Sequence, residues 1–97
     1  MLGDTRQRAE RRLFDVHARL ERARTELAIG EEQLAVLDDV AEEAHVRALV
    51  SETPLADREW HEAARHADAQ RRAVEATRVV VAELERSQDE LIGKLIP

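Results

Sequence analysis

Apolar side chains recur every three and four residues along most of this chain. From residue 9 to residue 48 the steps alternate between four and three, and no occupant is charged. Residues 56–95 repeat the same spacing. A 3.5-residue period sustained over this length is typical of helices that pack as a coiled coil. The pattern therefore predicts an all-α protein with two long helices, over about residues 4–50 and 54–95.

The positions that follow this spacing are called the seam below. In the first stretch the seam consists of Ala9, Leu13, Val16, Leu20, Ala23, Leu27, Gly30, Leu34, Leu37, Ala41, Ala44 and Ala48. In the second stretch it consists of Ala56, Trp60, Ala63, Ala67, Gln70, Val74, Thr77, Val81, Leu84, Gln88, Leu91 and Leu95. We expect these residues to be the buried ones.

A single convincing break separates the two stretches. Thr53 followed by Pro54 is typical of a helix N-cap and first helical position. Asp57 adds negative charge to the first turn, where the helix dipole favours it. Because a turn over residues 51–53 is short, the helices should be antiparallel neighbours. We therefore predict one helical hairpin domain over residues 1–97.

Folding the chain at this turn brings large seam residues opposite small ones. Val74 should face Gly30, and Trp60 should face Ala44. A glycine inside a helix costs about 1 kcal/mol relative to alanine. The predicted register gives Gly30 a packing reason, since it leaves room for Val74.

Charged residues beside the seam offer a second prediction of register. The expected neighbours across the two helices are Glu31 with Arg71, His45 with Asp57, and His17 with Glu85, with Arg24 and Arg78 as a like-charge exception. Each exposed ion pair contributes only about 0–1 kcal/mol. Their value here is therefore as a test of register.

A second row of apolar residues runs along one side of the predicted hairpin. Its members are Ile29, Val36, Val40, Ala73, Ala76 and Val80. A two-helix hairpin rich in alanine buries little apolar area by itself. We therefore expect a homodimer that forms a four-helix bundle. The alternative is that the same face docks a helix of another protein, in a helix-in-groove arrangement.

Charge is distributed unevenly along the chain. The chain has 15 basic and 21 acidic residues, a net charge of −6. Residues 31–62 hold ten of the acids and only two arginines. Four of these acids, Asp38, Asp39, Glu42 and Glu43, are expected to steer the turn end toward a basic partner. One alternative function is therefore a transcription regulator that contacts RNA polymerase or a sigma factor. Nucleic acid is not an expected partner, because phosphate binding needs concentrated positive charge.

Catalytic and metal-binding patterns are weak. The chain has no cysteine. His61 and His66 are five residues apart, about 140° around a helix, so they cannot share a metal ion on one face. Glu42 and His45 have the Glu-x-x-His spacing of di-iron bundles, which leaves a ferritin-like metal oxidase assembled across a dimer as an alternative. We expect neither catalysis nor a cofactor.

The sequence shows no apolar run long enough to span a membrane and no apolar signal core near its start. Charged residues make up 37% of the chain and aromatic residues 2%, which argues against a β-domain. We therefore expect a cytoplasmic, non-catalytic protein–protein interaction or regulatory module.

Overall fold

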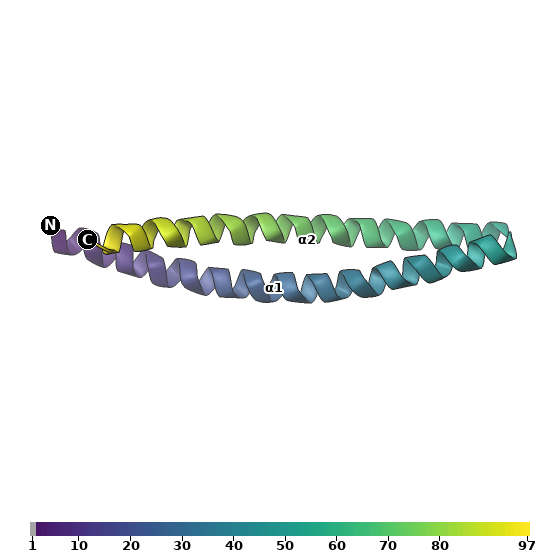
Figure 1. Cartoon of the computed structure of the whole chain (residues 1–97), viewed down its shortest axis with the longest axis horizontal. Coiled ribbons are helices and arrows are strands. Elements are labelled where there is room, and N and C mark those ends of the chain that lie inside the picture. The colour runs from purple at the N-terminus through teal and green to yellow at the C-terminus, as the bar shows by residue number, and fades with distance from the viewer. Residues whose placement is uncertain (1) are drawn as a thin grey trace. The chain divides into compact units, whose positions relative to one another are not determined.

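Two long helices make up almost all of this protein (Figure 1). The computed structural model describes the backbone of residues 2–97 and the side chains of residues 3–97. Helix α1 spans Leu2–Ser51 and helix α2 spans Pro54–Leu95, and this described part of the chain contains no strand. The predicted all-helical fold is confirmed, and α1 extends slightly further at both ends than the spacing predicted.

The connection between the helices is as short as the sequence indicates. Glu52 has a φ of 52°, and its amide donates to the Ala48 carbonyl at 3.1 Å. This left-handed residue ends α1 in the manner of an αL cap. The Thr53 hydroxyl then accepts a hydrogen bond from the Ala56 amide at 3.2 Å. The predicted N-cap at Thr53 is therefore confirmed, with Pro54 as the first helical residue.

The chain divides into two compact units, each built from a segment of both helices. Unit 1 comprises Met1–Glu26 and Thr77–Pro97, and unit 2 comprises Leu27–Ala76. In unit 1, His17 contacts Gln88 and Arg24 contacts Glu85, so the two segments run antiparallel. Unit 2 contains the turn and is a helical hairpin by itself.

Seam residues form the core of both units. All the predicted seam positions are buried or half-buried. Outside the seam, the side chains of residues 3–97 that reach half-burial are His45, Ala64, Ala82 and Ser87. The 3.5-residue period thus located the packing surface of each helix correctly, because a left-handed supercoil keeps such a seam facing its partner.

The core of unit 1 is aliphatic and contains several large side chains. Its buried apolar residues are Val16, Leu20, Ala23, Val81, Leu84 and Leu91, and Leu20 is 0% exposed. In unit 2 the buried residues are smaller, namely Ala44, Ala67 and Val74. Larger seam residues of unit 2, such as Leu34, Leu37 and Trp60, are only half-buried, so the fully buried part of this core consists of smaller side chains.

Gly30 lies at a close contact between the two helices in the unit 2 seam. A Cβ atom added to Gly30 would lie 3.3 Å from Cγ2 of Val74, which confirms the predicted pairing of these two residues. The side-chain amide of Gln70 donates to the Gly30 carbonyl at 3.1 Å and to Oε1 of Gln33 at 3.3 Å. The polar seam residue Gln70 is therefore satisfied by hydrogen bonds that also fix the alignment of the two helices.

No helix within residues 2–97 is both long enough and apolar enough to cross a lipid bilayer. Charged residues recur along both helices and interrupt the apolar runs.

Candidate interaction surfaces

Ion pairs between the helices lie along one edge of each unit. In unit 2, Arg71 pairs with Asp38 at 2.5 Å and with Asp68 at 2.9 Å. In unit 1, Arg24 pairs with Glu21 at 3.0 Å and with Glu85 at 3.7 Å. These side chains are about half exposed. The edge is therefore polar and solvated.

The partners across this edge are shifted by one heptad from the predicted ones. Arg71 was expected beside Glu31 and instead bonds Asp38, seven residues further along α1. Arg24 was expected beside Arg78 and instead lies near Glu85, seven residues further along α2.

The direction of helical side chains explains this shift. Each side chain leans toward the N-terminus of its own helix. In an antiparallel pair, both leanings bring together residues with higher numbers than those directly opposite along the backbones. The prediction paired residues that lie directly opposite along the backbones and ignored this direction. Its pairs for Arg71 and Arg24 are therefore wrong by seven residues, which is one heptad or about two helical turns.

Two histidines of unit 2, His45 and His61, lie against the Trp60 ring near the turn. His45 stacks on Trp60, with ring centroids 4.0 Å apart and an interplanar angle of 12°. Nδ1 of His61 lies 2.7 Å from the Asp57 carbonyl and 3.5 Å from Oδ2 of Asp57. The sequence analysis expected His45 beside Asp57. In the structure His61 contacts Asp57, and His45 packs on Trp60. Among the described residues, no group of three or more potential metal ligands is placed to hold an ion.

Apolar side chains lie exposed on the other side of unit 2. Ile29 is 50% exposed, Val36 61% and Val40 44%. Ala73 and Ala76 of α2 are exposed as well. These five residues are called the unit 2 apolar face below. Val80, the remaining residue of the predicted face, is exposed but belongs to unit 1.

The four acids singled out in the sequence have two different environments. Asp38 lies on the solvated edge and is engaged by Arg71. Asp39, Glu42 and Glu43 line one open hollow on the outer surface of α1, together with Val46 and Arg47. Asp39, Glu42, Glu43 and Val46 are called the acidic patch below.

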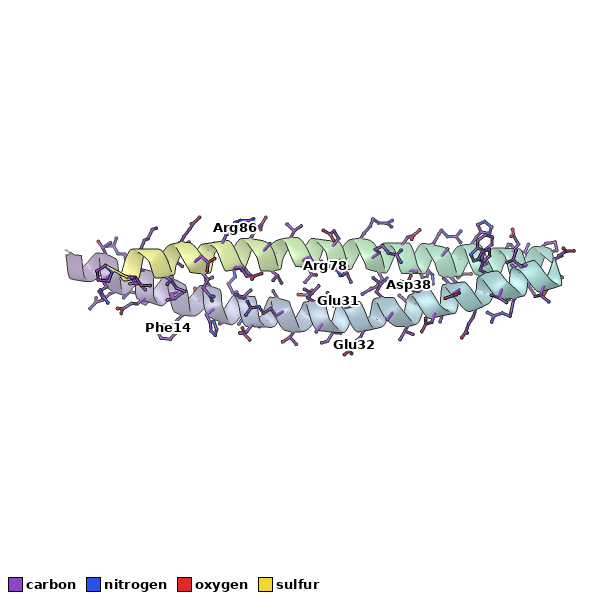
Figure 2. The ribbon with its side chains drawn as sticks, viewed as in Figure 1. Phe14, Glu31, Glu32, Asp38, Arg78 and Arg86 are labelled. Atoms are coloured by element: carbon purple, nitrogen blue, oxygen red, sulfur yellow. The ribbon has the colours of Figure 1, made fainter. Side chains whose placement is uncertain are left out.

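A second hollow lies on α1 in unit 1 and was not selected as a site from the sequence. Phe14, Asp15 and three arginines line it: Arg8, Arg11 and Arg12. Phe14 is 79% exposed, and its ring points away from α2 (Figure 2). Arg8, Arg11, Arg12 and Phe14 are called the basic–aromatic patch below. A large aromatic side chain beside the seam, rather than in it, was the signal that could have identified this surface.

Comparisons of this chain with protein-family models, with curated proteins and with solved structures find no match. The exposed surfaces of the two units are therefore the observations from which we argue a function.

Proposed function

We propose that this chain is a non-catalytic protein–protein interaction module that pairs with a second copy of itself through the unit 2 apolar face. In such a homodimer the two helices of each unit 2 hairpin would pack against those of the partner as four helices. The observation that carries this proposal is the exposure of Ile29, Val36 and Val40 on one side of unit 2.

The composition of the face supports helix packing rather than contact with solvent. Ala73 and Ala76 contribute small side chains from α2, beside the larger ones from α1. Large residues on one helix and small ones on the next form the ridges and grooves that a further helix can fill. The solvated ion pairs of unit 2 lie on the opposite edge, so covering this face would separate none of them.

The acidic patch favours a second candidate function in the same class. Asp39, Glu42 and Glu43 are exposed and share one hollow. Clustered carboxylates accelerate encounter with a basic surface. A regulator that contacts a basic surface of RNA polymerase or of a sigma factor would use this acidic patch. Asp39→Lys tests this function, because it should weaken binding to such a surface.

The dimer is tested by replacing Val36 with glutamate. We expect Val36→Glu to place a charge in the interface and to shift the protein toward the monomer mass of 11.0 kDa in sedimentation equilibrium. Val79→Glu is the matched control, because Val79 is 49% exposed on α2 outside this face. The control should associate as the unaltered chain does. A concentration-independent monomer mass for the unaltered chain would overturn the proposed dimer.

A further inference from the structure

The two hollows on α1 carry the same residue spacing with opposite charge. In unit 1, Arg8, Arg11 and Arg12 follow the spacing i, i+3, i+4. In unit 2, Asp39, Glu42 and Glu43 follow the same spacing. On a helix this spacing places three side chains on one continuous patch of surface. Each unit thus displays three like charges in the same arrangement, positive in one unit and negative in the other.

The likeness extends to the residues that follow each set of charges. The basic set is followed by apolar Phe14 and then by Asp15. The acidic set is followed by apolar Val46 and then by Arg47. Phe14 is 79% exposed and Val46 is 54% exposed. Each hollow therefore also holds one apolar residue and one residue of opposite charge, although Phe14 and Asp15 come one position earlier after their set than Val46 and Arg47 do after theirs.

The charged groups of both patches are free to meet a partner. Within residues 3–97 of a single chain, no ion pair or hydrogen bond involves the side chains of Arg8, Arg11, Arg12, Asp39, Glu42 or Glu43. Asp38, next to the acidic patch, differs in this respect because it already pairs with Arg71. Arginine and carboxylate groups that lack local partners can form charge-assisted hydrogen bonds on association.

We propose that the basic–aromatic patch of one copy binds the acidic patch of a second copy. This inference rests on the proposed self-association and adds a second pair of surfaces to it. The equal spacing allows all three arginines to reach all three carboxylates at once. Phe14 would lose its contact with water against Val46, and Leu49, 65% exposed one turn further along α1, would extend that apolar contact. Aromatic and arginine side chains are the residues that most often dominate association energies.

A reciprocal exchange of charges tests this pairing. The first variant carries Arg8→Glu, Arg11→Glu and Arg12→Glu, and the second carries Asp39→Arg, Glu42→Arg and Glu43→Arg. Each variant alone presents two patches of like charge, so we expect its self-association constant to fall at least about tenfold. A 1:1 mixture of the two variants again presents opposite charges across both contacts. Sedimentation velocity of this mixture should recover the association of the unaltered chain.

A matched control separates the effect of altered net charge from the effect of altered charge within the patches. Arg58, Arg65 and Arg72 are exposed arginines on α2, outside both patches. Replacing all three with glutamate alters the net charge as the first variant does, and association should be retained. Far-UV circular dichroism of every variant should show the helicity of the unaltered chain, because all the substituted side chains are exposed.

The outcomes distinguish this inference from the proposed dimer. If either variant alone associates as the unaltered chain does, or if the mixture does not recover association, the patches do not bind each other. If Val36→Glu abolishes association while the charge variants have no effect, the dimer stands and the patch pairing is overturned. If Val36→Glu has no effect while the charge exchange abolishes and restores association, the patches alone carry it.

Discussion

The two units of this protein share one seam pattern but fill it with side chains of different size. Unit 1 buries Val16, Leu20 and Leu84, with Leu20 completely covered. Unit 2 buries Ala44 and Ala67 instead, with Val74 as its one buried side chain larger than alanine among the described residues. Each buried leucine contributes about 1.5–3 kcal/mol more than the same side chain would when exposed, and an alanine contributes much less. Unit 1 therefore has the stronger hydrophobic core.

The same comparison holds for the outer surfaces. Unit 2 leaves many of its large apolar residues exposed: Ile29, Val36, Val40, Val46, Leu49, Val50 and Leu55. A hairpin with a small-residue core and an apolar exterior gains stability when another surface covers that exterior. The difference teaches that one repeat of sequence spacing can fill its buried positions with large aliphatic side chains in one unit and with smaller ones in the other.

The largest expected effect comes from truncating the core of unit 1. Leu20→Ala should lower the free energy of unfolding by about 2–5 kcal/mol, because Leu20 is 0% exposed and its loss leaves a cavity. Leu49→Ala removes the same atoms from a side chain that is 65% exposed, and its effect should stay within about 0.5 kcal/mol. Urea denaturation followed by circular dichroism measures both. Equal losses from the two variants would contradict the assignment of the core.

A smaller effect is expected from filling the close approach in unit 2. Gly30→Leu should destabilise the protein by about 1–3 kcal/mol, since even a Cβ atom there lies 3.3 Å from Val74. A Cβ at Gly93 meets nothing within 4 Å, so Gly93→Leu should stabilise the helix by up to about 1 kcal/mol. The opposite signs, read from thermal unfolding, would confirm that the unit 2 helices approach closely. A stabilising Gly30→Leu would show that the approach is looser than the structure indicates.

Much of this fold could be predicted from the sequence because it depends on period and on local capping. The alternation of three and four located the seam, and Thr53-Pro54 located the start of α2. The packing role of Gly30 followed from register alone. These features need only the geometry of an ideal helix and the position of the turn.

The interaction surfaces were harder to predict because they depend on side-chain direction and exposure. Arg71 pairs with Asp38 since both side chains lean toward their own N-termini, which a comparison of positions does not include. Asp38 and Asp39 are adjacent in sequence, yet one is ion-paired and the other lines the acidic patch. The exposure of Phe14 likewise follows from its place one residue beyond the seam residue Leu13.

The smallest expected effect comes from the ion pairs of the solvated edge. These pairs lie outside the unit 2 apolar face and outside the two charged patches. Arg71→Gln in unit 2 and Arg24→Gln in unit 1 should each cost about 0–1 kcal/mol, because the side chains in these pairs remain about half exposed. Arg71→Gln should cost more, since its contact with Asp38 is 2.5 Å and that of Arg24 with Glu85 is 3.7 Å. High salt should reduce both losses, because it screens exposed charges.

Arg72→Gln, at an exposed neighbouring position, provides the control for urea denaturation. A loss above about 2 kcal/mol, or any change in self-association for Arg71→Gln, would mean that this edge is buried in the assembly and that the partner covers a different side of unit 2.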